Sequence, residues 1–284
     1  MNNVVIDVSK WQWFIDYNGL KLHSPVKGAL VKCSQGKVVD DRSDAHITGF
    51  QQVDMPTAVY HWYDPYVSVK DQLEVIRAML NKHPKLRVVA IDVEQFGYTY
   101  RNLPPIKDPQ WLSDTIYSLV TGVKTLGVDV AIYTRALLIL EKFKPILNWL
   151  YDPKLDLIVW LASYPYDRTV ISVAWEGLMS SWAPKTFSPY YSNNWPVHKR
   201  YADVCQWSGD NFILPFNNNS KSVASPVDLN YFSDEALKRF TKPLPTQPSE
   251  AEKLIATVYN ELIDLKSHDI KELDYILGLL KPKG

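Results

Sequence analysis

The sequence predicts an α/β fold, and a β/α barrel is favoured over a doubly wound sheet. Short apolar runs rich in β-branched residues alternate with amphipathic segments over about 240 residues, which is typical of a largely parallel sheet. Polar and aromatic residues gather at the carboxyl ends of these runs, where β/α barrels carry their active sites. The seven expected strands are Val4–Val8, Ala29–Cys33, Thr57–Trp62, Val88–Val93, Val128–Tyr133, Leu157–Ala162 and Ala202–Trp207.

Three helices are expected between these strands. Apolar residues recur at helical spacing over Asp71–Asn81. A second helix over Asp108–Leu126 opens with an aspartate followed by a proline, which suits a capping residue and the first helical position. The segment Thr134–Leu150 is apolar along one face, and Pro145 predicts a kink or break within it.

Between the sixth and seventh expected strands, and again after the main domain, the pattern changes. Residues 164–201 are rich in aromatic residues, Ser, Pro and Asn with weak periodicity, so we expect an irregular excursion that packs on itself or forms a binding wall. We expect a main domain over 1–242, a Pro-rich linker over 243–248 and a short helical tail over 249–284. The tail cannot close a core alone, so it docks on the barrel, self-associates or binds a partner.

Composition excludes several classes of protein. The 284 residues carry 31 Lys+Arg and 31 Asp+Glu, and such balance argues against a nucleic-acid partner. No apolar run reaches the ~18–20 residues of a membrane span. The first residues lack the pattern of a secretory signal, so we expect synthesis in the cytoplasm. Only Cys33 and Cys205 are present, and both thiols are expected to be reduced.

The sharpest local signal is Ile91-Asp92-Val93-Glu94. Residues two apart on a strand point to the same face, so the two carboxyl groups project together from Cα atoms about 6.6 Å apart. Carboxyl groups this close do not titrate independently, so one keeps its proton to higher pH while the other stays ionised. Acid/base catalysis requires such a difference between the two pKa values. The motif alone leaves two alternatives open, a solvated strand end and a metal site.

A second pair of acids strengthens the catalytic interpretation. Asp7 lies in the first strand, and Asp228 lies near the end of the main domain. First and last strands are neighbours in a closed barrel, so these acids are expected to meet Asp92 and Glu94 at one rim. Four carboxylates suit Mg²⁺ or Ca²⁺ as well, but no calcium loop, zinc spacing of histidines or phosphate-binding loop is present, and no cofactor is expected.

Seven short motifs follow one another through the main domain: Asp7-Val8-Ser9-Lys10-Trp11-Gln12, Val59-Tyr60-His61-Trp62, Ile91-Asp92-Val93-Glu94, Ile132-Tyr133-Thr134, Trp160-Leu161-Ala162-Ser163-Tyr164, Gln206-Trp207 and Asp228-Leu229-Asn230-Tyr231-Phe232. In this order they resemble the family-25 glycoside hydrolases, which are lysozymes of the N-acetylmuramidase type. The resemblance implies a distorted TIM-like barrel with a helix-poor second half. It also implies hydrolysis of the β-1,4 bond between N-acetylmuramic acid and N-acetylglucosamine in bacterial peptidoglycan.

The resemblance also implies roles for individual residues. Glu94 matches the general acid/base, and Asp92 matches its partner at the anomeric centre or the N-acetyl group. Asp7 and Asp228 match the other acids of the rim. The positions that match the lining of the sugar groove are Tyr60, Tyr133, Trp160, Tyr164, Gln206 and Trp207.

One departure keeps a second function open. The family commonly has an acid in an A-T-E-G segment where this chain has Gln35, and the missing charge bears on optimum pH and rate. A peptidoglycan-binding module without turnover is therefore the alternative. A chitinase of the D-x-x-D-x-D-x-E type is disfavoured, because Arg87 and Ala90 stand where that pattern needs acids. An enzyme without an export signal suits a phage endolysin that reaches the wall after release from the host cytoplasm.

Overall fold

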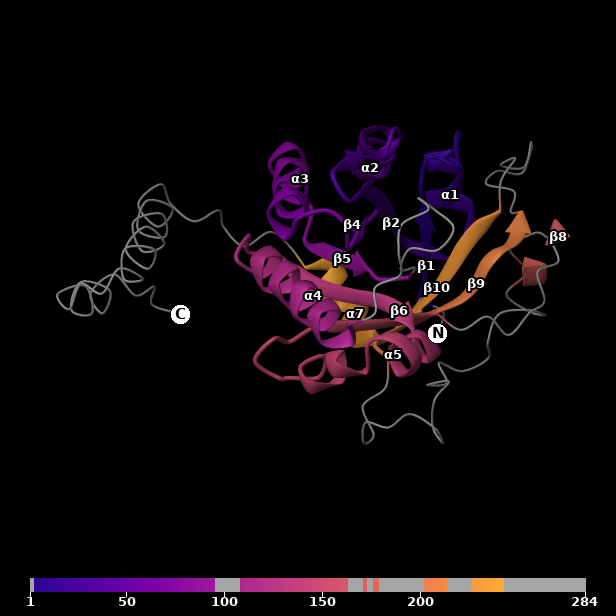
Figure 1. Ribbon diagram of the computed structural model, residues 1–284. Coiled ribbons are helices and arrows are strands. Elements are labelled where there is room, and N and C mark those ends of the chain that lie inside the picture. Colours follow the sequence, from indigo (N-terminus) through magenta and orange to yellow (C-terminus); the bar gives the residue numbers. More distant parts are fainter. Residues whose placement is uncertain are drawn as a thin grey trace. The chain divides into compact units, whose positions relative to one another are not determined.

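The computed structural model describes residues 3–94, 108–162, 171–172, 176–178, 202–213 and 226–242. Within them, eight strands close into a mixed barrel (Figure 1). Around the barrel the strands follow the order β1 (Val4–Val8), β2 (Val26–Gln35), β4 (Thr57–Trp62), β5 (Val88–Asp92), β6 (Asp129–Arg135), β7 (Ile158–Ala162), β9 (Val204–Ile213) and β10 (Val227–Phe232). Two short strands attach to it, β3 (Val38–Val39) to β2 and β8 (Ile171–Ser172) to β9.

The barrel is closed at β1, which pairs in parallel with β2 and antiparallel with β10. The neighbouring position of the first and last strands, expected from the sequence, is confirmed. The expectation of a parallel sheet is wrong for β10, which runs antiparallel to both β1 and β9.

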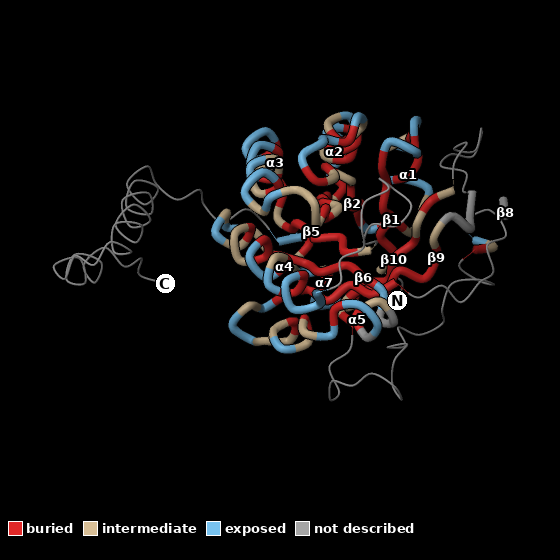
Figure 2. The backbone as a smooth tube through the Cα atoms, viewed as in Figure 1, coloured by how far each residue is buried: buried red, intermediate tan, exposed pale blue. Residues whose placement is uncertain are grey.

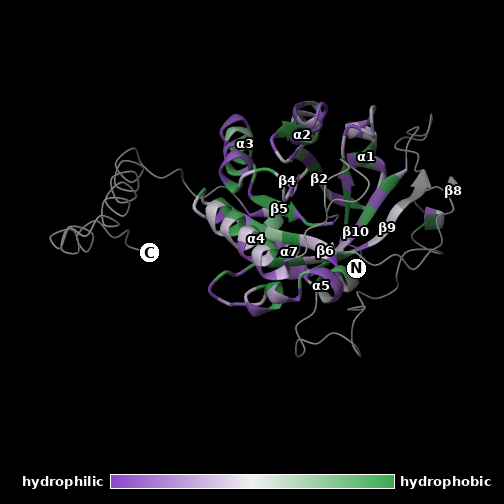
Figure 3. Ribbon diagram, in the orientation of Figure 1, coloured by the Kyte–Doolittle hydropathy of each residue, from purple (hydrophilic) through white to green (hydrophobic). Residues whose placement is uncertain are grey.

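Helices pack around the outside of the barrel and across one end of it. They are α1 (Tyr17–His23), α2 (Ser43–Gln52), α3 (Val69–Lys82), α4 (Pro109–Lys124), α5 (Ala136–Lys142), the 3₁₀ helix η1 (Lys144–Asn148) and α7 (Asp234–Thr241). Their sequences mix apolar and hydrophilic residues (Figure 3), and their exposed sides surround buried strands (Figure 2). No described helix is long and apolar enough to cross a bilayer.

Strand residues alternate between two apolar layers. On β5, Val89 and Ile91 join the layer between strands and helices, whereas Val88 and Ala90 join a smaller cluster inside the barrel. Burial on both faces explains why these strands are continuous apolar runs in the sequence. Small residues fit the narrow interior, which contains Ala58, Ala90 and Ala131.

Local signals placed the predicted helices well. Asp108 caps α4 by accepting hydrogen bonds from the backbone of Gln110 and Trp111, with Pro109 in the first turn. At Pro145 the helical path changes as predicted, because α5 ends at Lys142 and the chain continues as 3₁₀ helix. The helices α1, α2 and α7 were not predicted.

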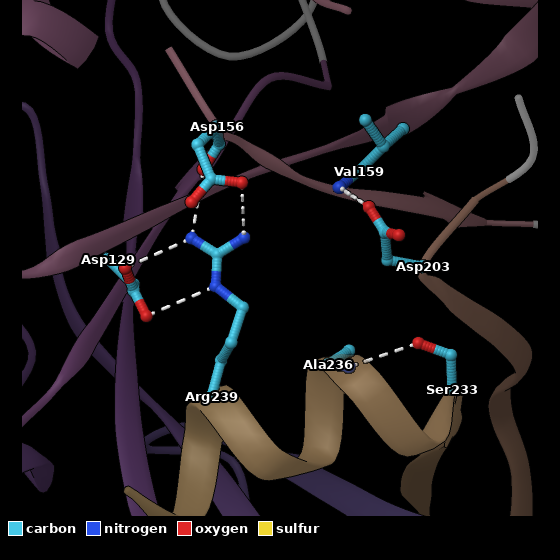
Figure 4. Close-up of polar contacts among 7 residues, drawn as sticks. All are labelled: Asp129, Asp156, Val159, Asp203, Ser233, Ala236 and Arg239. Carbon is cyan, nitrogen blue, oxygen red and sulfur yellow. Dashed lines mark hydrogen bonds and ion pairs between the residues drawn. The ribbon is translucent and has the colours of Figure 1, made fainter. Parts of the chain in front are cut away.

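One end of the barrel is closed by α7. Phe240 enters the interior cluster, and its ring lies 5.3 Å from that of Phe232. Arg239 forms ion pairs with Asp129 at 3.0 Å and Asp156 at 3.3 Å (Figure 4). Ser233 caps the helix by accepting a hydrogen bond from the Ala236 backbone. These contacts fix the helix that follows β10.

Both cysteines are buried free thiols, as predicted. Burial raises the pKa of the Cys33 and Cys205 thiols to about 11, so they stay protonated at neutral pH. By compactness the chain divides into Met1–Lys242 and Pro243–Gly284. The linker and tail expected over 243–284 lie outside the described residues, as does almost all of the excursion expected over 164–201.

Candidate active site

Three of the four predicted acids lie on barrel strands. Asp7 and Asp228 are directly paired across β1 and β10, and Asp92 is the last residue of β5. Asp7 is 6% exposed and Asp92 is 3% exposed. Buried carboxyl groups are costly unless hydrogen bonds, protons or a ligand compensate them, so their grouping needs a chemical explanation.

Amide groups hold Asp7 from one side. Asn230 Nδ2 donates to Asp7 Oδ2 at 2.7 Å, and Gln206 Nε2 donates to the same oxygen at 2.9 Å. Gln206 Nε2 also lies 3.3 Å from Asp228 Oδ2, so one amide joins the two acids. Burial raises the pKa of Asp7 to about 6, although the hydrogen bonds from Asn230 and Gln206 act in the opposite direction.

Two aromatic side chains orient these amides. Trp160 Nε1 donates to Asn230 Oδ1 at 2.8 Å, and Tyr133 donates its hydroxyl proton to Gln206 Oε1. The Tyr133 and Trp160 rings contact each other with centroids 4.4 Å apart. An indole N–H only donates, so the Asn230 oxygen faces Trp160 and its nitrogen faces Asp7. Tyr133, Trp160 and Gln206, predicted as groove residues, thus belong to one network with Asp7.

Asp92 lies beside a different set of charges. Burial, and then the charge of Glu94, raise the pKa of Asp92 well above its ordinary value, against the opposing effect of Lys32. Asp92 Oδ1 is buried and has no hydrogen-bond partner within the described part of the chain. An acceptor of this kind suits a ligand that supplies a donor or a developing positive charge.

Glu94 continues the alternation of β5. Val93 is fully buried in the outer layer, and its backbone N–H donates to Tyr133 O at 2.9 Å, so the strand geometry persists past Asp92. Glu94 is half-buried and acts electrostatically on Asp92, Asp7 and Lys32. The same-face placement predicted for Asp92 and Glu94 agrees with this alternation.

Lys32 is a site residue that the sequence analysis missed. Its Nζ lies 4.4 Å from the centroid of the Trp62 ring and donates to Gln35 Oε1 at 3.3 Å. Burial lowers the pKa of Lys32, while the charges of Asp92, Asp40 and Glu94 act in the opposite direction. Gln35 therefore lies beside a cation whose charge acts on Asp92. Alternation with Leu30 of the interior cluster indicates the inward direction of Lys32, but its partner Trp62 on β4 could not be read from the sequence.

The other predicted residues are divided between the two faces of the barrel. Tyr60 faces the interior, and burial followed by the charges of Asp7 and Asp92 raises its pKa well above the ordinary value. Trp207 does not join this group, because it is fully buried in the outer layer, with its ring 6.2 Å from that of Tyr231. Tyr164 lies outside the described residues. Asn230 was missed, since an asparagine in a strand carries no distinctive pattern.

The described residues include no group of three or more His, Cys, Asp or Glu side chains placed to hold a metal ion. An open groove of about 500 Å³ lies between β3, α2 and α3, lined by Val39, Asp44, Glu74, Met79 and Lys82 among others. It contains none of the predicted site residues. The four acids are thus the candidate active site: Asp7, Asp92 and Glu94 lie at or just past the carboxyl ends of β1 and β5, and Asp228 lies at the amino end of the antiparallel strand β10.

A β/α barrel with grouped carboxyl groups at the carboxyl ends of its strands is the architecture of barrel glycoside hydrolases. The sequence profile of Glycosyl hydrolases family 25 matches residues 6–187. The chain therefore belongs to glycoside hydrolase family 25.

Solved structures share the fold at low sequence identity. The catalytic domain of endolysin ply40 from bacteriophage P40 of Listeria monocytogenes is 21% identical with a TM-score of 0.59, covering 85% of this chain and 98% of that one. The bacterial lysozyme from Streptomyces coelicolor is 18% identical, with the same TM-score and coverage. A family 25 glycosyl hydrolase from Bacillus anthracis is 18% identical with a TM-score of 0.57, covering 84% and 94%. No curated protein sequence matches the chain.

Proposed function

We propose that the protein is a muramidase that hydrolyses the β-1,4 bond between N-acetylmuramic acid and N-acetylglucosamine in bacterial peptidoglycan. The observation that carries this proposal is the Asp92–Glu94 pair: Asp92 is buried at the end of β5, and Glu94 is half-buried two residues further on, where its charge acts on Asp92. Family membership and the fold shared with a bacterial lysozyme support it.

The pair suits proton transfer to a leaving sugar. Because burial and mutual repulsion oppose two negative charges, the pair retains one proton to higher pH than an isolated carboxyl group does. Glu94, the more exposed member, gives this proton to the glycosidic oxygen as the bond to the anomeric carbon breaks. Asp92 stabilises the positive charge that develops, directly or through the substrate's N-acetyl group. Water then adds to the anomeric carbon, and its proton returns to Glu94.

The test is the rate at which the purified chain releases new reducing ends from peptidoglycan. Glu94→Gln removes the transferable proton and keeps the side-chain size, so turnover is expected to fall by at least about 10³-fold. Thermal unfolding of the variant serves as the folding control. Mass analysis of the fragments identifies the bond cut. Undiminished turnover in Glu94→Gln would remove this residue from its assigned role.

Gln35 favours one alternative, a module that binds peptidoglycan without cleaving it. The neutral amide stands beside Lys32, where a carboxylate would add charge near Asp92 and Glu94. Glycan binding without new reducing ends would support this alternative. Retention of Asp7, Asp92, Glu94 and Asp228 in one barrel favours the enzyme, because binding alone does not need four acids.

We also propose that the protein acts as an endolysin, made in a host cytoplasm and reaching the wall after release. The shared fold with the catalytic domain of a phage endolysin supports this role. Expression in a bacterial cytoplasm is expected to lyse cells only when the membrane is permeabilised separately. Lysis at the same rate without permeabilisation would contradict the proposed route.

A further inference from the structure

The segment after β1 exposes three large aromatic side chains. Trp11 is 71% exposed, Trp13 is 68% exposed and Phe14 is 69% exposed. Elsewhere in the described residues, the large apolar side chains with high exposure are Leu22, Val38, Val39, Trp111 and Tyr117. Three aromatics within four positions are therefore a local concentration, and exposed patches of this kind mark interaction sites.

Gln12, which lies between the aromatics, and Ile15, which follows them, hold the segment in place. Gln12 Oε1 accepts a hydrogen bond from Ser9 N at 2.9 Å, and Gln12 Nε2 donates to Pro226 O at 2.8 Å. Ile15 is buried in the outer layer. Inward-facing Gln12 and Ile15 thus fix a backbone from which the aromatic side chains point to solvent.

Basic side chains brace two of the rings. The Arg42 guanidinium lies 4.3 Å from the centroid of the Trp13 ring, and its Nη2 donates to Trp13 O at 2.6 Å. Lys10 Nζ lies 5.6 Å from the centroid of the Trp11 ring. A ring that is already held loses less conformational entropy when a ligand binds to it.

The segment adjoins the candidate active site. It begins two residues after Asp7, at the carboxyl end of β1, and its anchor Pro226 directly precedes β10, which carries Asp228. Figure 1 shows β1 and β10 side by side in the barrel wall, in agreement with their pairing. The exposed aromatics therefore lie on the segment that directly follows the strand of Asp7 and is hydrogen-bonded to the residue that precedes the strand of Asp228.

We propose that Trp11, Trp13 and Phe14 form a stacking platform for pyranose rings of the glycan strand, beyond the sugars that contact the acids. This inference rests on the proposed function. Aromatic faces pack against the apolar C–H faces of sugars, and a polymeric substrate extends past the bond that is cut. An anionic bilayer is the disfavoured occupant, because Asp40 and Asp41 directly precede Arg42 in the sequence, Asp40 accepts a hydrogen bond from the Arg42 backbone, and these charges oppose the positive field that such a surface attracts.

The test measures binding of the full chain carrying Glu94→Gln to peptidoglycan sacculi freed of wall polymers with hydrofluoric acid. Adding Trp13→Ala and Phe14→Ala is expected to weaken binding by about tenfold or more. The matched control adds Tyr117→Ala, which removes an exposed aromatic from the outer surface of α4, and is expected to bind within about twofold of the parent. Replacing the two residues by Trp13→Phe and Phe14→Tyr retains flat rings and is expected to restore binding.

Three results would overturn the platform. The folded alanine variant could bind sacculi as well as its parent does, or the Tyr117→Ala control could lose as much binding as the alanine variant. The alanine variant could also lose binding to phosphatidylglycerol vesicles while it still binds sacculi. Thermal unfolding establishes that each variant is folded. A different result would contradict the proposed function alone: the unmodified chain releases no reducing ends from peptidoglycan, while the aromatic substitutions still weaken binding to sacculi.

Discussion

The indole N–H of Trp160 donates to Asn230 Oδ1 at 2.8 Å, and this contact determines which end of the Asn230 amide faces Asp7. The opposite end donates to Asp7 Oδ2 at 2.7 Å. A residue of β7 thereby acts on the carboxyl group of β1 through a residue of β10. Removing the amide nitrogen should therefore change the titration of the site while leaving the barrel strands in place.

Asn230→Asp tests this relationship. The variant replaces a donor to Asp7 by a second carboxyl oxygen, so the pKa values of both acids rise. We expect the free energy of unfolding to fall by roughly 2–3 kcal/mol at pH 8. The loss should shrink as the pH is lowered, because a carboxyl group with a raised folded pKa destabilises only where it is ionised.

Urea unfolding at pH 8 and pH 5 provides the measurement. Asn3→Asp is the matched control, since Asn3 also donates to a carboxylate, Asp234 Oδ1 at 2.7 Å, but in an exposed position. It should cost less than about 1 kcal/mol, as surface interactions do. An equal loss in both variants at pH 8 would contradict the argument.

Asp7 makes the folded protein less stable at neutral pH than in mild acid. Its folded pKa is raised from 3.8 to about 6, so the folded state binds the proton more tightly than the unfolded state does. Its contribution to stability is therefore most favourable below pH 4 and declines as the pH rises to about 6. By linkage the decline is roughly 3 kcal/mol.

Asp7→Asn should remove this decline. Above pH 6 the variant is expected to unfold at higher urea concentration than the unmodified chain, while peptidoglycan hydrolysis falls because the rim loses an acid. Below pH 4 the difference in stability should vanish. The measurement consists of urea titrations of both proteins below pH 4 and above pH 6. A difference in the free energy of unfolding that is the same at both pH values would refute the raised pKa of Asp7.

The sequence could predict the acids of the site and, through the family resemblance, three of the side chains that support Asp7, namely Tyr133, Trp160 and Gln206. Asp92 and Glu94 followed from alternation on one strand, and Asp7 with Asp228 followed from barrel closure. Trp207 shows where the prediction failed. It is adjacent to Gln206 on β9, so both side chains cannot face the interior, and Trp207 packs in the outer layer.

Asn230 and Lys32 show a second limit. Their functions arise from partners on other strands, Trp160 for Asn230 and Trp62 for Lys32, and such pairs appear only when the register of the barrel is known. The direction of β10 was likewise hidden, since a buried strand has the same apolar alternation in either direction.

Gly28 lies at a close contact between β2 and α7. A Cβ atom there would lie 2.4 Å from Phe240 Cε1 and 2.9 Å from Pro56 O. Gly28→Ala is expected to destabilise the protein by about 1–3 kcal/mol, because the ring and a backbone oxygen must both move. Gly122→Ala is the control, as its nearest atom is the flexible end of Leu73 at 3.0 Å and alanine favours the helix.

Thermal unfolding of the two glycine variants distinguishes close approach from a general effect of the added methyl group. Combining Gly28→Ala with Phe240→Leu should recover part of the loss, since the smaller side chain frees the space. A Gly28→Ala protein as stable as the unmodified chain would contradict the packing of α7 against β2.

Arg239 should contribute more to stability than a surface ion pair does. Its side chain is 12% exposed and pairs with Asp129, which is 27% exposed, whereas Lys82 and Asp44 form a pair that is 61% and 47% exposed. Arg239→Met keeps the aliphatic packing but leaves Asp129 without its cation, and we expect a loss of about 2–3 kcal/mol. Lys82→Met should change the free energy of unfolding by less than about 1 kcal/mol. Urea unfolding at low and high salt tests the contrast, because salt screens the exposed pair more strongly, and equal losses at low salt would show that α7 is not held by this ion pair.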